Sequence, residues 1–420
     1  MDAATAIEID DVSFDVCPVC DTLVKKETLE HHVEAHFKHQ DRNDTTAEQE
    51  SSADTIDVRQ KLPGPPCKKT CSQSDVLANE TSDEMLARVL QEEEKWEIER
   101  QKEKEKEEFH KLQHKYGMNS ASGYADQYTQ SLNKDVSKNK LSMPEYYSKK
   151  EKLLDSLLSG EESGETCTTG VINHLQQQIR TKGPTPNHFV RLCCPTDHFS
   201  SSYGDKSWGC GYRNLQMLLS ALIKLEHYKG AISKVCQNIP SIPTIQQLIE
   251  DAWRHGYDQQ GAAQLDHKLT KTKKWIGATE IAVALKFIGL RAHIVDFYQA
   301  TAADGTHPEL FAWMKRYFSK DSAQSPVYIQ HQGHSRLVVG FEERYTKIKT
   351  QHLILFDPSH PPKKMQEVFG GERKQNTGFN MLRKTTKQMK SKQYQLVYVD
   401  GIMTEAEKQD SKTLSSVRIP

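Results

Sequence analysis

The sequence has no long apolar run and no recognisable leader. In its 420 residues no stretch approaches the roughly 18 consecutive apolar residues that span a bilayer, so we expect no membrane-spanning segment and no membrane partner. The opening MDAATAIEIDD has neither the basic nor the apolar region of a secretory signal. These absences predict an intracellular protein.

An excess of charge of one sign is also missing. Lys and Arg number 56 against 57 Asp and Glu, a net charge of -1, so overall charge gives no reason to expect direct nucleic-acid binding. Cysteine is not scarce: an intracellular protein keeps its nine cysteines mostly reduced, which favours metal binding or catalysis over a disulfide framework.

Composition divides the chain. Polar and charged residues dominate 41–80, which we interpret as a disordered linker. The segment 81–118 predicts one long helix from about Ser82 to Tyr116, because it is rich in helix formers and contains no Pro or Gly before Gly117. A second, polar helical segment covers 119–168. From 169 to 420, helical and strand-like apolar patterns alternate, which predicts an α+β domain.

A metal-binding pattern occupies the N-terminal segment 11–40. CPVCDTLVKKETLEHHVEAHF has the Cys-x2-Cys and His-x3-His spacing that places two thiolates and two imidazoles around a tetrahedral, structural Zn2+. The predicted ligands are Cys17, Cys20, His32 and His36, and spacing alone does not separate His32 from His31. The predicted helix of this finger, KKETLEHHVEAHF, mixes acidic and basic residues, and no tandem finger follows. We therefore favour protein binding over DNA binding.

A narrow apolar stripe marks the start of the long helix. Leu86, Ala87 and Leu90 lie on one face, with carboxylates around them. Such a face suits a partner with an aliphatic patch ringed by basic residues, because Ala87 allows close approach. The alternative is a solvated, charged helix.

The stretch GDKSWGCGYRNLQMLLSALIKL places Cys210 between two glycines at the start of an amphipathic helix. The glycines allow a sharp turn and close approach of a substrate. The helix N-terminus favours a thiolate, and its free N-H groups can stabilise an oxyanion. The alternative is a small buried cysteine. We take Cys167, Cys193, Cys194 and Cys236 as structural.

A nucleophilic cysteine needs a base, and the base needs an orienting group. If YIQHQGHSRLVVGFE and HLILFDPSH are antiparallel strands with a turn centred between Tyr345 and Thr346, His334 lies directly opposite Asp357. The same register places Leu337 opposite Ile354. His360 is a competing base, and the Gln330 amide is placed to donate to an oxyanion.

Three blocks carry a family resemblance. SWGCGYRNLQML, QHQGHSRLVVGFE and FDPSHPPKKMQ resemble the zinc-finger-containing ubiquitin peptidases, deubiquitinases of the papain-like class related to peptidases of the ubiquitin-fold modifier. The resemblance implies a papain-like cysteine peptidase domain over 169–420. In it Cys210 is the nucleophile, His334 the base, Asp357 its orienting group and Gln330 the oxyanion donor.

The resemblance also implies binding modules and a substrate. The finger resembles a ubiquitin-binding finger, DEMLARVLQEEE an inverted ubiquitin-interacting motif, and 119–168 a helical ubiquitin-binding segment. These imply hydrolysis of polyubiquitin chains, of lysine-63 linkage, on ubiquitinated proteins in nucleus and cytoplasm, connected with genome maintenance. Successive modules on a stiff helix raise the effective concentration of a chain at the active site.

Further substrate-binding residues follow from the resemblance. Asp258 and Glu280 are the acids that would meet ubiquitin's arginine-containing, glycine-rich tail, although either also suits a helix cap or a surface charge. Trp208 would shape the channel wall, with core packing as its plain alternative.

Three departures from the resemblance matter. Ser359 stands where modifier-specific members place their histidine, which favours the ubiquitin-cleaving branch. A single finger indicates a shorter form than the full-length members. Ser207 replaces a common glycine, with little expected effect. The rival functions are a peptidase for another ubiquitin-like modifier and a non-catalytic ubiquitin-binding adaptor.

Overall fold

The protein is described here from a computed structural model. It describes residues 14–16, 23–25, 88, 90–104, 123–183, 187–320, 322–345, 348–370 and 378–419. The chain divides into two compact units, Met1–Asn79 and Glu80–Pro420.

The first unit contains a short antiparallel pair of strands. β1 (Phe14–Val16) pairs with β2 (Leu23–Lys25), with Phe14 opposite Lys25 and Val16 opposite Leu23. The Cys-x2-Cys pattern falls in the segment that joins these strands, between Val16 and Leu23.

The predicted long helix is helical wherever the structure describes it, at 88 and over 90–104. Leu90 is 56% exposed and Trp96 is 72% exposed, so this part of the helix leaves large apolar side chains in solvent. No described helix combines the length and apolar character that crossing a membrane requires.

An eight-stranded, mixed sheet forms the centre of the described part of the second unit. Its order is β10-β9-β8-β7-β11-β6-β12, and β4 pairs with the far half of β8. The strands are β4 (His188–Leu192), β6 (Leu290–Phe297), β7 (Val327–His331), β8 (His334–Tyr345), β9 (Lys349–Phe356), β10 (Arg383–Thr385), β11 (Tyr394–Ile402) and β12 (Ser416–Ile419). Separately, β3 (Cys167–Thr168) pairs with β5 (His198–Phe199).

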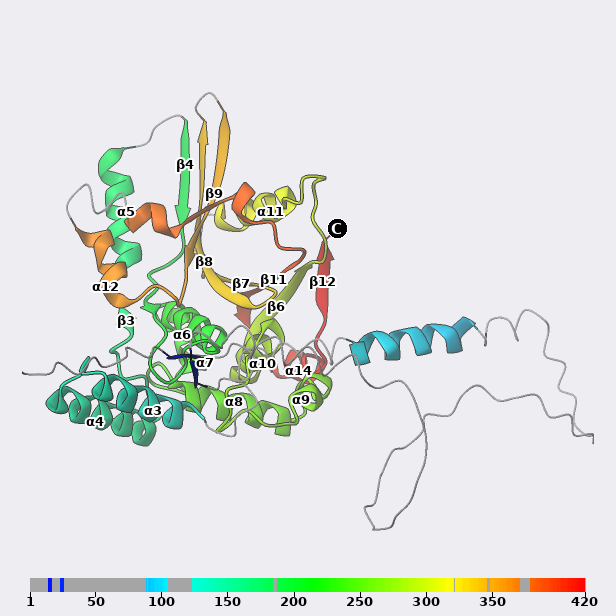
Figure 1. Ribbon diagram of the computed structural model, residues 1–420. Helices are drawn as coiled ribbons and strands as arrows, with labels where there is room; N and C mark the ends of the chain where they lie inside the picture. Colours follow the sequence, from blue (N-terminus) through cyan, green and yellow to red (C-terminus); the bar gives the residue numbers. More distant parts are fainter. Residues whose placement is uncertain are drawn as a thin grey trace, which may run out of the picture. The chain divides into compact units, whose positions relative to one another are not determined.

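Helices surround this sheet. They are α3 (Tyr124–Ser137), α4 (Met143–Ser159), α5 (Val171–Lys182), α6 (Cys210–Leu222), α7 (Glu226–Ile232), α8 (Ile242–Arg254), α9 (Gln259–Gln264), α10 (Ala278–Ile288), α11 (Pro308–Phe318), α12 (Pro362–Met365) and α14 (Glu405–Asp410), with 3-10 turns η2 (Gln366–Phe369) and η3 (Thr386–Gln388). Figure 1 shows α6, α8 and α10 gathered at one end of the sheet. The α+β expectation is confirmed.

Helix α6 is buried on every side. The sequence predicted an amphipathic helix, but all residues from Gly211 to Leu222 are buried. The reason is its position between β7 and β8 of the sheet and helix α8. The polar side chains of α6, such as Arg213 and Gln216, therefore hydrogen-bond to buried protein groups instead of water.

Helices α3 and α4 share the core of the sheet domain. Tyr124, Tyr128 and Leu132 of α3 and Leu153 of α4 belong to the same buried apolar cluster as the sheet. The described part of 119–168 is therefore packed into the peptidase domain that the sequence places from 169 onward.

The hairpin of β7 and β8 is tight and presents one histidine at each strand end. His331 pairs with His334 across a connection of Gln332 and Gly333. Gly333 has φ +82, which L side chains rarely adopt, so glycine is needed to close this turn.

The β8–β9 register differs from the predicted one. Leu337 lies opposite Phe356, not Ile354, and the ladder shifts between Val338 and Gly340. The offset is already present at the turn end of the ladder, where Tyr345 lies opposite Lys349, so the count began from a wrongly placed turn. The bulge-type shift between Val338 and Gly340 changes the register by only one residue. The predicted register is therefore wrong, and His334 and Asp357 are not direct cross-strand partners.

Candidate active site

Cys210 is the first residue of α6, with Gly209 as N-cap, and its side chain is half-buried. A Cβ on Gly209 would lie 2.4 Å from the Asp205 side chain, and one on Gly211 would lie 2.4 Å from the carbonyl oxygen of Ile276. Both glycines are thus required because protein atoms approach the backbone closely, not because of an unusual backbone angle.

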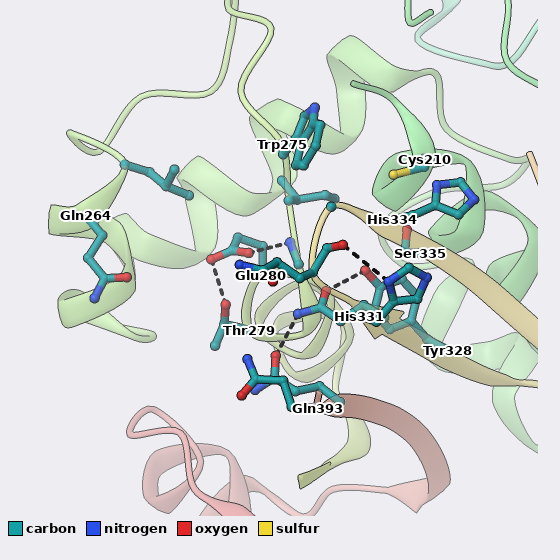
Figure 2. A pocket seen from close by; sticks show the side chains of 17 residues that line it. Cys210, Gln264, Trp275, Thr279, Glu280, Tyr328, His331, His334, Ser335 and Gln393 are labelled. Carbon is teal, nitrogen blue, oxygen red and sulfur yellow. Dashed lines mark hydrogen bonds between the residues drawn. The ribbon is translucent and has the colours of Figure 1, made fainter. Parts of the chain in front are cut away.

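His334 begins β8, and its imidazole interacts with the Cys210 thiol. Figure 2 shows the sulfur beside the imidazole ring at the rim of a cavity. Burial raises the pKa of the Cys210 thiol, but its interaction with the neighbouring His334 imidazole outweighs burial and holds that pKa below its ordinary value. Burial lowers the pKa of His334, while its hydrogen bonds to Asp357 and Cys210 raise it to about 9. The pair therefore favours thiolate and imidazolium.

Asp357 reaches His334 from just beyond the end of β9. His334 Nε2 lies 3.1 Å from each carboxylate oxygen of Asp357. The Arg336 Nε donates to the same carboxylate at 2.6 Å, and the Ser359 N-H donates at 2.9 Å. Burial raises the pKa of Asp357, but His334 and Arg336 hold it far below its usual range. The predicted contact between His334 and Asp357 is therefore present, but the two residues approach each other diagonally and are not paired across the strands.

The competition between His334 and His360 is resolved by position. The backbone N-H of His360 bonds to the Asp357 carbonyl, and its carbonyl accepts from the Ser200 hydroxyl at 2.6 Å. The interactions of Cys210 involve His334 and Ser335. The structure therefore assigns the imidazole beside the sulfur to His334.

Sequence reasoning missed two polar residues that surround the sulfur. The Ser335 N-H and hydroxyl both interact with Cys210 and lower the pKa of its thiol. Asn214, one turn along α6, donates to the Ser335 hydroxyl at 3.0 Å and to the Cys210 carbonyl at 2.9 Å. Ser335 directly follows His334 in the sequence, and Asn214 lies one helical turn after Cys210. These positions were the signal that could have identified both residues.

A cavity of about 260 Å³ opens at Cys210. Figure 2 shows its labelled side chains converging from α10, β7, β8 and the segment before β11. Its lining includes Trp275, Gly277, Glu280, Gln330, His331 and Gly333. His331 was not predicted. Its Nε2 is 3.1 Å from Arg336 Nη1, and burial together with that charge lowers the pKa of its ring.

Gln330 lines this cavity but its amide is already engaged. Its Oε1 accepts from the Ala278 N-H and the Tyr328 hydroxyl, each at 2.9 Å, which fixes the orientation of the amide. Its Nε2 donates to Gln395 Oε1 at 2.6 Å. One amide hydrogen is therefore used by Gln395, and the second has no acceptor among the described residues, which leaves it for a ligand.

The two predicted acids both cap helices. Glu280 lines the cavity, accepts from the Gly277 N-H at 2.7 Å, and burial raises the pKa of its carboxyl. Asp258 caps α9 by accepting from the Gly261 N-H at 3.2 Å, and does not line the cavity. Its Oδ2 is buried without a hydrogen-bond partner in the described structure.

Trp208 does not form a wall of the cavity. It is 1% exposed and its indole packs edge-on against Tyr212, so the interpretation as channel wall is wrong and the core-packing alternative holds. Trp275 stands at the cavity instead, half-buried, and donates its indole N-H to the Ser207 carbonyl at 3.2 Å.

The other described cysteines differ from Cys210. All five described cysteines are free, and burial raises the pKa of Cys194 to about 11, that of Cys167 to about 11, and that of Cys193 and Cys236 above its ordinary value. Their thiols remain protonated, as expected of structural cysteines.

Several predicted residues lie outside the described part of the chain. These are the zinc ligands Cys17, Cys20, His32 and His36, the alternative His31, and Leu86 and Ala87 of the helix stripe. Elsewhere, the described residues contain no group of three or more His, Cys, Asp or Glu suited to a metal ion.

Comparison with known proteins identifies relatives. Zinc finger-containing ubiquitin peptidase 1 from Rattus norvegicus is 40% identical over 358 residues, covering 81% of this chain and 60% of that protein. The Homo sapiens protein of the same name is 38% identical over 363 residues, with 83% and 60% covered. Ubiquitin carboxyl-terminal hydrolase mug105 from Schizosaccharomyces pombe is 34% identical over 181 residues, covering 39% of this chain and 72% of that protein. The resemblance inferred from the three sequence blocks is confirmed.

The chain spans about 60% of the length of the mammalian relatives it matches. Among solved structures, UfSP from C. elegans is 18% identical, with a TM-score of 0.37 over 54% of this chain and 37% of that chain. The family model of Peptidase family C78 matches residues 185–397 of this chain, a range that contains Cys210, His334 and Asp357. This chain therefore belongs to peptidase family C78.

Proposed function

We propose that the chain is a papain-like cysteine peptidase that hydrolyses the bond following the C-terminus of ubiquitin. The observation that carries the proposal is the placement of His334, whose ring lies beside the Cys210 sulfur and hydrogen-bonds to Asp357 through Nε2 (Figure 2). The names of the relatives, all ubiquitin peptidases or hydrolases, support ubiquitin as the modifier.

The chemistry runs through two acyl-transfer steps. The Cys210 thiolate attacks the carbonyl carbon of the isopeptide bond, the C-N bond breaks, and His334 gives its proton to the leaving amine. His334 then takes a proton from water, which attacks the thioester and releases the ubiquitin carboxylate and the thiolate. Asp357 keeps the ring oriented throughout, because both its oxygens hold Nε2.

Two donors would stabilise the oxyanion. The Cys210 N-H is in the first turn of α6, where N-H groups have no partner within the helix. The second hydrogen of Gln330 Nε2 is in the same cavity. Both donors are fixed in place before the reaction, which is the condition for strong electrostatic stabilisation.

The cavity suits a glycine-rich tail with a basic side chain. Gly277 and Gly333 contribute no side chains to its walls, so a narrow extended backbone can pass between Trp275 and His331. Glu280 is the carboxylate in the lining and would meet an arginine of the tail. We assign Asp258 a supporting role, because its negative charge acts near Glu280 and adds to the attraction for a basic side chain.

Binding modules before the peptidase domain would hold further ubiquitins of a chain. Helix α4 supports this, because it exposes Met143, Tyr147, Leu154 and Leu158 along its length. These apolar side chains are available to an aliphatic patch on ubiquitin. With the zinc finger and the stripe of Leu86, Ala87 and Leu90, they favour cleavage of long chains, for which we propose lysine-63 linkage. We also propose action on ubiquitinated proteins in nucleus and cytoplasm.

Activity-based probes made from ubiquitin and from other ubiquitin-like modifiers test this proposal. We expect covalent attachment of the ubiquitin probe at Cys210 and none of a modifier probe. Attachment of a modifier probe alone would favour the rival peptidase, and no attachment of either would favour the adaptor. A panel of differently linked chains then tests the lysine-63 preference.

A further inference from the structure

The loop formed by residues 201–209, which leads into α6, rests against helix α3. The Tyr124 hydroxyl of α3 lies 3.0 Å from the Ser202 Oγ. A Cβ on Gly204 would lie only 2.7 Å from the Tyr124 ring, so the loop backbone is in close contact with this helix. The position of α3 therefore bears directly on the loop that carries Cys210.

Gln127 of α3 holds the loop at two points. Its Nε2 donates to the Lys206 carbonyl at 3.1 Å, and its Oε1 accepts from the Trp208 indole N-H at 3.0 Å. A single amide thus bridges the residues on either side of Ser207. The geometry is that of a clamp on one turn of the backbone.

The clamped turn is strained. Ser207 has φ +79, in the left-handed region where a residue with a Cβ is destabilised relative to glycine. Such conformations persist when the surrounding contacts impose them. Here the contacts are Gln127 on both flanks and the Trp275 indole on the Ser207 carbonyl. Glycine at this position would relieve this strain.

The turn is connected to the sulfur by a short and stiff path. The Gly209 N-H donates to the Asp205 carbonyl at 2.8 Å, and the Asp205 carboxylate receives Arg213 Nε and Nη2, each at 3.0 Å. His334 belongs to the sheet and not to this loop. A change in the turn at Ser207 therefore moves Cys210 relative to His334.

We propose that Gln127 is a positioning residue that keeps the Cys210 sulfur within hydrogen-bonding reach of His334 by holding the Ser207 turn. This inference rests on the proposed role of Cys210 as nucleophile. It gives α3 a function within the peptidase site, in addition to the ubiquitin binding expected of its segment.

The test measures Cys210 itself with a reagent too small to need ubiquitin binding. Full-length Gln127→Ala protein is alkylated with iodoacetamide over a range of pH, and modification of the Cys210 peptide is followed by mass spectrometry. Misplaced reacting groups lose rates steeply, so we expect alkylation near neutral pH to slow on the order of tenfold. The pH profile should also move to higher pH, because the thiol loses its imidazolium partner.

Gln130→Ala is the matched control. Gln130 is on the same helix and is exposed, so this variant should keep the wild-type alkylation profile. Steady-state cleavage of a ubiquitin C-terminal amide then separates positioning from binding. Gln127→Ala should lower kcat and leave KM nearly unchanged.

A second background tests the route through the turn. In Ser207→Gly protein the left-handed backbone is unstrained, so Gln127→Ala should cost less than it does in the wild type. An equal loss in both backgrounds would overturn the proposed route. Unchanged alkylation in Gln127→Ala, or an effect on KM alone, would overturn the positioning role.

Failure of the proposed function looks different. If wild-type Cys210 reacts no faster than the half-buried Cys236, the nucleophile assignment itself fails. If wild-type Cys210 reacts fast and Gln127→Ala reacts equally fast, only the positioning role fails.

Discussion

His334 Nε2 lies 3.1 Å from both carboxylate oxygens of Asp357, although the two residues are not paired across β8 and β9. Asp357 follows the last residue of β9 and turns back toward the start of β8, where Arg336 and the Ser359 N-H fix its oxygens. The remaining ring nitrogen of His334 is left for Cys210. The predictions below follow from this geometry and from the packing around it.

Replacing the sulfur should abolish cleavage and preserve the fold. Cys210→Ala removes the nucleophile but leaves a small side chain at the start of α6, so we expect hydrolysis of ubiquitin substrates to fall on the order of 10³-fold or more. Binding of polyubiquitin, measured by pull-down, should be retained. Cys236→Ala, at another half-buried cysteine, should keep full activity. Equal activity of both variants would sink the nucleophile assignment.

The pH profile of kcat/KM should be bell-shaped. Activity falls on the acid side as the Cys210 thiolate takes up a proton, below the ordinary thiol pKa of 9.0, and on the alkaline side as His334, with a pKa of about 9, loses its proton. These limbs belong to the coupled pair.

Asp357→Asn tests the alkaline limb of that profile. Without the carboxylate, the pKa of His334 should drop back toward its ordinary 6.5, and the alkaline limb should move to lower pH. A limb that stays near pH 9 in this variant would show that His334 does not set it.

The Gln330 amide should act on the rate of the chemical step. Gln330→Ala removes an oxyanion donor, so kcat should fall on the order of 10²-fold while KM changes little. Gln395→Ala, which removes only the acceptor of Gln330 Nε2, should lower kcat far less. A rise in KM with kcat unchanged would instead assign Gln330 to substrate binding.

The glycine after the nucleophile should be indispensable for packing. Gly211→Ala places a Cβ 2.4 Å from the Ile276 carbonyl oxygen, so we expect a loss of about 1–3 kcal/mol in the free energy of unfolding. Gly230→Ala in α7, where an added Cβ meets nothing within 4 Å, should gain about 0.5–1 kcal/mol. Denaturant unfolding of both variants measures the contrast. A stable Gly211→Ala protein would contradict the close packing.

Zinc should matter for recruitment and not for bond breaking. Chelation should slow cleavage of long polyubiquitin chains and leave hydrolysis of a mono-ubiquitin C-terminal amide unchanged, because the proposed finger lies far outside the matched residues 185–397. Cys17→Ala with Cys20→Ala should reproduce this pattern without a chelator. Loss of mono-ubiquitin hydrolysis would place the metal in catalysis.

The sequence by itself identified the chemistry. Cys210 between glycines at a helix start, and the blocks around His334 and Asp357, were recognisable because nucleophile, base and orienting group need particular residue types and local settings. The α+β class also followed, because periodic apolar patterns encode local structure.

Only the tertiary structure decided how these parts meet. The position of the turn set the register, with Tyr345 opposite Lys349, and the bulge in β8 shifted it by one residue. The contact of His334 with Asp357 is therefore made by a diagonal approach, which the count along the chain did not give. Trp208, predicted at the cavity wall, is buried in the core, whereas Trp275 and Ser335 line the cavity. Helix α3 came to clamp the loop before Cys210 through Gln127, because contacts between distant segments depend on how the whole core packs, which local sequence does not specify.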